Sequence, residues 1–374
     1  MLGLSLGCAL CVVAIWIGYP LVIAAMASRG SQAQKSATSP ARRQVSVIIA
    51  TRDEPAVIEA RVADMLASDY PRELLEVVVG TDRSGTQTPE QIAARLRPLS
   101  SAIQVVAGDE PGGKASTLNA AVARATGELL VFTDSAQRFA PDTIRLLVEA
   151  LEDERFGAVS GALHTGGAGG GGLADHYWRY EKWLRLNEAR VHSTVGVTGA
   201  VYAMRRSCWQ ALPSGLILDD VYGPMDLVLR GYRVGFRPDA RAYDDRRFPA
   251  AQEFRRKART LTGVVQLCAW LPGVLVPWRN PIWLQFVFHK LLRLTTPYFL
   301  VVGAIAGAAW LATLLVAAAP AVLWGALASV ALVMLFAVTN RRMREAITMV
   351  VAMQGAVVRA TVNGLRGEWD VWRR

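Results

Sequence analysis

Two long stretches of the 374-residue chain contain no charged residue, and they limit which parts can fold as a water-soluble domain. These stretches are residues 1–28 and residues 294–340. A helix that crosses a bilayer needs about 20 predominantly apolar residues. We therefore expect one membrane helix at residues 1–28 and two at residues 294–340, with a turn near Pro320.

The first apolar stretch has a second interpretation, as a cleaved signal peptide, because Ala25-Met26-Ala27 is typical of a cleavage site. Signal peptides begin with basic residues and have an apolar core of about 7–15 residues. No Lys or Arg precedes this stretch, and it is longer than such a core. A retained membrane anchor is therefore the favoured interpretation.

The formal net charge of +10 is concentrated beside these apolar stretches. The flanking basic residues are Arg29, Lys35, Arg42, Arg43, Arg341, Arg342, Arg344, Arg366, Arg373 and Arg374. Lys and Arg accumulate on the cytoplasmic side of membrane helices. This predicts a multi-pass protein of the inner (cytoplasmic) membrane, with the N-terminus outside and residues 29–293 in the cytosol. Membrane lipids of negative charge, and no nucleic acid, are the expected partners of this charge.

Residues 29–43 form a polar linker by composition, and apolar β-branched runs then alternate with segments of helical spacing. The expected strands cover residues 45–51, 75–81, 103–107 and 129–133, and the helices residues 56–67, 89–96, 115–125 and 141–151. Such alternation predicts an α/β domain with an open, mostly parallel sheet and helices on both faces. Asp53, Glu54, Asp82 and Asp134 follow three of these strands, at the edge where such sheets bind ligands.

The region between this domain and the last apolar stretch, residues 261–293, is interrupted by prolines and contains Trp270, Trp278 and Trp283. Trp favours the membrane interface, where amphipathic helices can lie in the membrane plane. We expect interfacial helices here, with a fourth membrane span as the alternative. Residues 341–374 contain an uncharged, mostly apolar run of only 13 residues, at 346–358, and are expected to form an interfacial helix and a basic cytosolic tail.

Six segments in order resemble the motifs of family 2 glycosyltransferases. They are VSVIIATRDE at 45–54, EVVVGTDRSGT at 76–86, GKASTLNAA at 113–121, LVFTDSA at 130–136, ILDD at 217–220 and RKART at 256–260. The resemblance covers residues 44–260 and implies a GT-A-like fold between the terminal membrane or interfacial helices. Each motif alone is common, whereas the ordered set is specific.

The resemblance implies a role for each of these side chains. Asp53, Glu54 and Asp82 would position the nucleotide, Lys114, Asn119, Arg256 and Arg259 would contact the diphosphate, Asp134 would bind Mg²⁺ or Mn²⁺, and Asp220 would act as general base beside Asp219. A divalent cation offsets diphosphate charge, and a carboxylate base accepts the acceptor proton. The implied reaction is inverting transfer from a UDP-sugar to a lipid-linked or polysaccharide acceptor, in cell-envelope or exopolysaccharide synthesis.

The chain departs from the family pattern at two places. Ala136 stands at the third position of the D-x-D metal motif, which leaves Asp134 alone to bind the cation. In the Q-x-x-R-W motif of processive members, Arg256 replaces the Gln and Thr260 the Trp. An aromatic face can hold a sugar ring while a polymer advances, so we expect addition of one or a few sugars.

Other interpretations of the same residues stay open. Asp82 and Asp219 are also typical of turn or helix-cap residues, and Lys114 and Arg259 of solvated charges. A polyprenyl-phosphate sugar synthase would need no general base, and a membrane transporter or receptor with a nucleotide-sensing domain would bind without turnover. The glycine run at 166–172 formally fits a dinucleotide fingerprint, but its late position favours a loop. Four aromatic residues, Tyr177, Trp178, Tyr180 and Trp183, belong to an expected helix at 175–190 and indicate packing or, more weakly, an acceptor site.

Overall fold

The computed structural model describes residues 1–29, 42–83, 85, 88–165, 173–246, 250–316 and 320–369. Most of the predicted linker and all of the glycine run at 166–172 lie outside the described residues. The chain divides into two compact units. The first contains Met1–Val22, Phe248–Val265 and Val287–Glu368, and the second contains Ile23–Arg247, Gln266–Phe286 and Trp369–Arg374.

The second unit contains an eight-stranded mixed sheet in the order β3-β2-β1-β4-β7-β6-β8-β5. Its strands are β1 (Val45–Thr51), β2 (Leu75–Thr81), β3 (Ile103–Ala107), β4 (Leu129–Thr133), β5 (Arg138–Phe139), β6 (Phe156–Thr165), β7 (Tyr202–Arg205) and β8 (Arg233–Asp244). Strand β1 pairs in parallel with β2 and β4, and β2 with β3. Strand β7 pairs antiparallel with β4 and β6. The predicted parallel α/β arrangement is confirmed for the first four strands, and the later strands make the sheet mixed.

The helices of this unit follow the strands along the chain. They are α3 (Pro55–Leu66), α4 (Pro89–Leu96), α5 (Lys114–Arg124), α6 (Thr143–Ala150), α7 (Leu173–Val191), α8 (Asp219–Leu229) and the short α10 (Trp283–Phe286). Thr88 caps α4 with a capping box. The Thr88 hydroxyl accepts a hydrogen bond from the Gln91 backbone N–H, and the Gln91 side-chain oxygen accepts one from the Thr88 backbone N–H.

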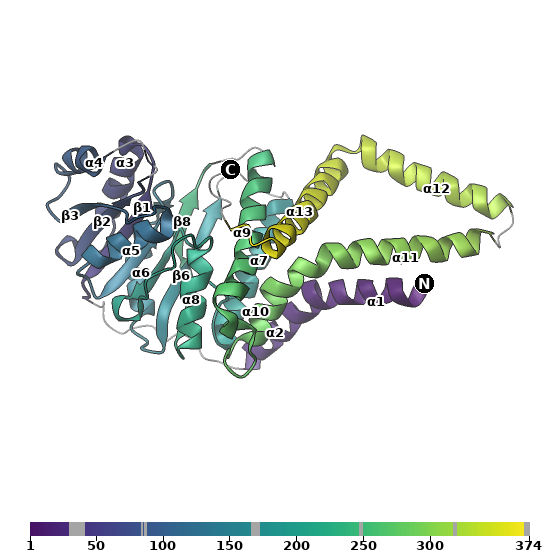
Figure 1. Cartoon of the computed structure of the whole chain (residues 1–374), viewed down its shortest axis with the longest axis horizontal. Helices are drawn as coiled ribbons and strands as arrows, with labels where there is room; N and C mark the ends of the chain where they lie inside the picture. Colours follow the sequence, from purple (N-terminus) through teal and green to yellow (C-terminus); the bar gives the residue numbers. More distant parts are fainter. Residues whose placement is uncertain are drawn as a thin grey trace. The chain divides into compact units, whose positions relative to one another are not determined.

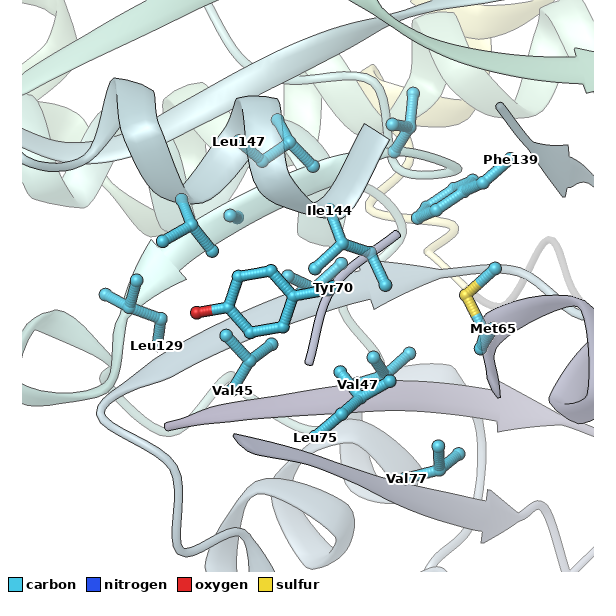
Figure 2. Close-up of a cluster of buried hydrophobic side chains, with 14 of the residues drawn as sticks. Val45, Val47, Met65, Tyr70, Leu75, Val77, Leu129, Phe139, Ile144 and Leu147 are labelled. Atoms are coloured by element: carbon cyan, nitrogen blue, oxygen red, sulfur yellow. The ribbon is translucent and has the colours of Figure 1, made fainter. Parts of the chain in front are cut away.

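Alternating side chains of the strands divide the packing between the two faces of the sheet. On one face, Val45 and Val47 of β1, Leu129 of β4 and Ile144 and Leu147 of α6 belong to one buried cluster (Figure 2). Helix α5 packs on the opposite face, where β2 has Gly80. A Cβ at Gly80 would lie 2.8 Å from Cγ2 of Thr117. The glycine therefore allows the helix that begins at the candidate site to approach the sheet closely.

The first unit is helical and contains α1 (Leu2–Val13), α11 (Thr296–Val316), α12 (Pro320–Thr339) and α13 (Arg341–Leu365). Helix α1 packs against α11 (Figure 1). At this contact, Gly303 and Gly307 lie one turn apart, and a Cβ at either would come within 3.0 Å of Cys8 or Ser5. Small residues at this spacing let two membrane helices approach closely. Helix α2 (Tyr19–Arg29) and helix α9 (Ala250–Trp270) each have residues in both units.

Four helices among the described residues are long and apolar enough to cross a membrane: Leu2–Arg29, Trp283–Val316, Val322–Thr339 and Met343–Leu365. The first three include the spans expected at residues 1–28 and 294–340, and α12 begins at Pro320 as expected. Two of them also extend into regions expected to be interfacial. Helical turns from Trp283 continue directly into α11, and α13 is 25 residues long. Whether residues 261–293 and 341–365 span the membrane or lie at its surface stays a prediction.

Candidate active site

A cleft of about 820 Å³ opens at the carboxyl ends of β1, β2 and β4, in the unit that contains the sheet. This volume lies in the range of small-molecule sites, about 300–1,000 Å³. The cleft is lined by residues 50–53, Asp82, residues 111–115, Thr117, residues 134–136, residues 214–216, Arg246, Trp270 and Trp369. It therefore contains Asp53, Asp82, Lys114 and Asp134, four of the predicted site residues.

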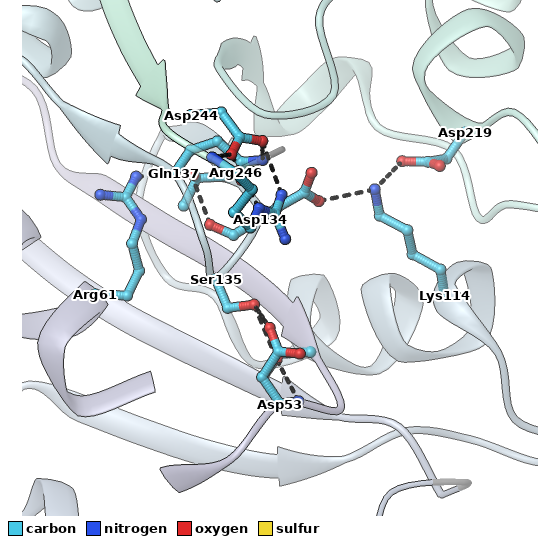
Figure 3. A network of polar contacts seen from close by, with 11 residues as sticks. Asp53, Arg61, Lys114, Asp134, Ser135, Gln137, Asp219, Asp244 and Arg246 are labelled. Atoms are coloured by element: carbon cyan, nitrogen blue, oxygen red, sulfur yellow. Dashed lines mark hydrogen bonds and ion pairs between the residues drawn. The ribbon is translucent and has the colours of Figure 1, made fainter. Parts of the chain in front are cut away.

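The end of β1 is tied to the end of β4 by short polar side chains. The Ser135 hydroxyl donates a hydrogen bond to the Asp53 carboxylate, and the Thr51 hydroxyl lies 3.2 Å from the Ser135 hydroxyl (Figure 3). The Thr51 side chain also accepts a hydrogen bond from the Asp53 backbone N–H at 2.9 Å. These contacts hold the Asp53 carboxylate at the edge of the cleft.

A glycine turn between β3 and α5 lies beside the end of β2. Gly112 and Gly113 both adopt positive φ, 90° and 92°, which favours residues without a Cβ. This turn brings the Gly113 N–H to 3.3 Å from an Asp82 carboxylate oxygen, and α5 begins at Lys114. Free backbone N–H groups at the start of a helix favour anions, so the turn places an anion-binding element beside Asp82.

Lys114 lies between two carboxylates from other elements (Figure 3). Its Nζ is 3.1 Å from Oδ1 of Asp134, directly after β4, and 3.4 Å from Oδ2 of Asp219, the first residue of α8. The side chain of Asp219 is only 10% exposed, whereas that of Asp134 is 39% exposed. Asp134 is therefore the carboxylate of this pair that a ligand in the cleft can reach.

Electrostatics confirm that the carboxylates gather at one place. Burial alone would lower the pKa of Lys114, but the negative charges of Asp134, Asp219 and Asp220 raise it above its ordinary value. The same three carboxylates add to burial in raising the pKa of Tyr202, which lies in β7 beneath them. Below Asp134, burial lowers the pKa of Arg61 to about 10, although this guanidinium pairs with Asp64.

Asp219 and Asp220 occupy the first turn of α8, but the residue that caps this helix is Leu218, without a side-chain cap. A simple capping role for Asp219 therefore does not describe its contacts, which are to Lys114. Asp220 is half-buried beside Gly199, where a Cβ would lie 3.5 Å from its Oδ2. The absence of a side chain at Gly199 leaves space next to the Asp220 carboxylate.

The segment that leads to this acidic pair is held by two side-chain amides. Asn119 of α5 donates to the Leu212 carbonyl and accepts from the Leu212 N–H, both at 2.9 Å. Gln266 of α9, which is fully buried, accepts from the Ile217 N–H at 2.9 Å and donates to the Gly215 carbonyl at 3.1 Å. Residues 212–217 are thus fixed at both ends.

The other six predicted residues do not line the cleft. Asp219 and Asp220 are two of them, and Asp219 is connected to the cleft through Lys114. The other four lie elsewhere. Asn119 uses its amide on Leu212, and Glu54 is an exposed residue that precedes α3. Arg256 and Arg259 lie on the part of α9 that belongs to the first unit. The predicted nucleotide contacts of these four residues stay predictions.

Sequence reasoning missed four residues that the structure brings to this site: Arg246, Gln266, Trp270 and Trp369. Arg246 follows β8 and pairs with Asp244 at 2.8 Å. The sequence signal that could have identified Arg246 is a charged run at the end of a strand, of the kind that also contains Asp53 and Asp82. Gln266 is a polar residue in a run without charge, Thr260 to Trp278. Such a residue is a candidate for a buried hydrogen bond.

A divalent cation fits the chemistry of the cleft. Among the described residues, no group of three or more His, Cys, Asp or Glu side chains could hold a metal alone. Mg²⁺, however, is usually bound through one or two carboxylates together with substrate phosphates. Asp134 is an exposed carboxylate in the cleft beside an anion-binding turn, and Ala136, at the third motif position, supplies no second one.

Comparison with known proteins identifies the family. Residues 46–210 match Glycosyl transferase family 2. The chain is 30% identical over 118 residues to a Beta-monoglucosyldiacylglycerol synthase of Synechocystis sp., covering 31% of this chain and 24% of that protein. It is 30% identical over 150 residues to an N-acetylglucosaminyltransferase of Rhizobium meliloti, covering 39% and 34%. The chain thus spans about a quarter to a third of the length of these two relatives.

The similarity to one solved structure extends over the whole chain. The mannosyltransferase PcManGT from Pyrobaculum calidifontis, in complex with GDP-Man and Mn²⁺, superposes with a TM-score of 0.74 and 26% identity, covering 97% of this chain and 99% of that one. The family match, the sheet and the cleft at its strand ends agree. Residues 46–210 are a Glycosyl transferase family 2 domain with a GT-A-like fold, and the described residues include helices long and apolar enough to cross a membrane.

Proposed function

We propose that the protein transfers one sugar, with inversion, from a UDP-sugar to the hydroxyl group of a membrane lipid acceptor. The observation that carries this proposal is the position of Lys114 between Asp134 and Asp219. Lys114 joins Asp134, the carboxylate suited to the donor diphosphate, to the acidic pair suited to the acceptor. Both halves of a sugar transfer are thus served at one place.

The donor nucleotide would occupy the cleft at the ends of β1 and β2. Asp53 and Asp82 would accept hydrogen bonds from the nucleoside, with Glu54 beside them. The diphosphate would lie against Lys114 and the turn at Gly112 and Gly113, where N–H groups and the start of α5 favour negative charge.

Asp134 would hold Mg²⁺ or Mn²⁺ together with phosphate oxygens, and the cation supplies neutralisation of the leaving nucleoside diphosphate. The chain's own contribution is to hold this carboxylate in place. Lys114 contacts one of its oxygens, and Arg61 donates a 2.7 Å hydrogen bond to the adjacent Thr133 hydroxyl. Charged donors placed where negative charge develops stabilise the transition state.

Asp220 would act as the general base. The Asp219 carboxylate is nearly buried and paired with Lys114, whereas Asp220 is half-buried beside the open position at Gly199. Asp220 would accept the proton of the acceptor hydroxyl while the acceptor oxygen bonds to the anomeric carbon. The bond to the nucleoside diphosphate breaks on the opposite face, which inverts the configuration.

The membrane supplies the acceptor in this proposal. Four candidate membrane helices support an acceptor that reaches the enzyme from the bilayer. The similarity to a Beta-monoglucosyldiacylglycerol synthase supports a lipid hydroxyl. The similarity to a structure solved with GDP-Man makes guanosine the nucleotide to compare with uridine.

The test is a transfer assay with the purified full chain in vesicles. Labelled UDP-glucose, UDP-N-acetylglucosamine and GDP-mannose are each supplied with vesicles containing diacylglycerol, glycosylated diacylglycerol or polyprenyl phosphate. We expect a UDP-sugar to give a short, lipid-soluble product. A product made only from GDP-mannose would contradict the proposed uridine nucleotide. A product made only on polyprenyl phosphate would contradict the proposed lipid hydroxyl as the acceptor. Nucleotide binding without any transfer would favour a sensing protein, and long polymer would contradict single addition.

A further inference from the structure

Two tryptophans, Trp270 and Trp369, line the cleft, and so do Ser214, Gly215 and Leu216. We propose that the two indoles form a subsite for a sugar ring of the acceptor, so that the acceptor is a glycosylated lipid. This inference rests on the proposed function and adds the chemical class of the acceptor headgroup.

The position of Trp270 follows from the anchoring of α9. Trp270 is the last residue of this helix, and Gln266 lies one turn before it on the same face. Gln266 binds Gly215 and Ile217, so the end of the helix is fixed against residues 214–217. Gly215 has a φ of +77°, and a Cβ there would lie 3.9 Å from the Trp270 ring. The ring is thus held against a residue that leaves space beside it.

Trp369 comes from a distant part of the sequence. The chain rejoins the sheet-containing unit at this residue, four residues after α13 ends at Leu365. Both indoles are half-buried, so each is packed on one side and accessible on another. Two such side chains in one cleft offer large, rigid contact surfaces with polar N–H groups.

The chemistry of the cleft favours a sugar over an acyl chain at these indoles. Asp53, Asp82, Lys114 and Asp134 line the same cleft. An acyl chain there would displace water from charged groups, which is costly. A sugar ring presents C–H groups to an aromatic face and keeps its hydroxyl groups in contact with water.

The subsite belongs to the acceptor because of the segment on which it is built. Residues 214–216 lead directly to Asp219 and Asp220, and the acceptor hydroxyl has to reach Asp220. The donor phosphates are expected at Lys114 and Gly113. A ring held at Trp270 thus lies next to the segment that carries the base.

The experiment measures acceptor kinetics with vesicles that contain either dioleoylglycerol or its monoglucosyl derivative. For the wild type we expect at least tenfold higher kcat/KM with the glucosyl lipid. Trp270→Ala and Trp369→Ala should each raise the KM for this lipid about tenfold, with nucleotide affinity changed less than twofold. Trp270→Phe and Trp369→Phe, which keep an aromatic face, should restore most of the loss and control for misfolding.

Trp183→Ala is the matched control, because Trp183 is 41% exposed on α7 and does not line the cleft among the described residues. An increase in KM with Trp183→Ala alone would move the sugar to α7 and overturn the inference. Equal use of both lipids, unaffected by either cleft tryptophan, would overturn it while the proposed function stands. No transfer to any lipid, with nucleotide still bound, would overturn both.

Discussion

The ammonium of Lys114 lies 3.4 Å from the carboxylate of Asp219, which connects the beginning of α5 to the beginning of α8. The same ammonium lies 3.1 Å from Asp134. One side chain therefore holds together three segments that are distant in the sequence: the glycine turn after Gly112, the end of β4 and the acidic pair. Under the proposed function, this single cation would position both the donor part and the acceptor part of the site.

Replacing this cation should weaken both parts. Lys114→Met should reduce kcat by about 10²–10³-fold, as for other losses of a group that stabilises developing charge, and should also weaken UDP binding. Binding is measured by calorimetry and turnover by product formation. Arg138→Met is the control, because Arg138 is a 71% exposed cation that pairs with Asp245. Wild-type turnover in Lys114→Met would remove Lys114 from the mechanism.

The proposed general base is Asp220, and a second carboxylate on the same helix, Asp226, provides the control. Asp220→Asn should lower kcat by about 10²–10⁴-fold, the usual contribution of a general base, with nucleotide affinity nearly unchanged. Asp226→Asn, on the same helix and paired with Arg230 at 2.8 Å, should leave kcat close to the wild-type value. If Asp220→Asn kept more than a tenth of the wild-type rate, the base would have to be another group.

Turnover should require a divalent cation. Asp134→Ala should weaken UDP binding in the presence of Mn²⁺ or Mg²⁺ and have a smaller effect in EDTA, because this carboxylate is the cation's expected protein ligand. Calorimetric titrations with and without EDTA measure the difference. Full activity in excess EDTA is the result that would exclude the cation.

Gln266 should act on catalysis through the position of residues 212–217. Gln266→Leu leaves the buried Ile217 N–H without its acceptor, which costs about 1–3 kcal/mol, and should lower kcat more than nucleotide affinity. Gln285→Leu is the matched control, since Gln285 is also buried and donates to two carbonyls, those of Glu188 and Ser193. Similar losses of stability but equal kcat in both variants would show that Gln266 is purely structural.

The membrane topology can be determined with reporters. A reporter after Arg374 should be cytosolic and one before Leu2 periplasmic, because basic residues follow Ser28 and Asn340. Paired alkaline phosphatase and fluorescent protein fusions distinguish the two sides. A periplasmic C-terminus would mean that an odd number of additional segments, such as Met343–Leu365, crosses the bilayer.

The sequence predicted the parts of the structure that depend on local patterns. The first four strands have β-branched apolar runs of five to seven residues, and the meeting of the carboxylates that follow three of them was expected from the parallel arrangement. Strand β5, with only Arg138 and Phe139, and β7, with four residues, are too short for such a pattern. Their antiparallel pairing depends on distant partners. The polar Gln266 in an uncharged run indicates a buried hydrogen bond, but the sequence does not show its partner Ile217, which is far along the chain.

The side-chain amides of Asn119 and Gln266 hold the backbone of residues 212–217, so the side chains of this segment are not needed for its position. Asn119 and Gln266 bind only backbone atoms of Leu212, Gly215 and Ile217. The side chains between these contacts, Pro213, Ser214 and Leu216, therefore carry none of this anchoring, and two of them face the cleft. Under the proposed function, substitutions at Ser214 and Leu216 would change the range of acceptors while the backbone that leads to the acidic pair keeps its anchoring.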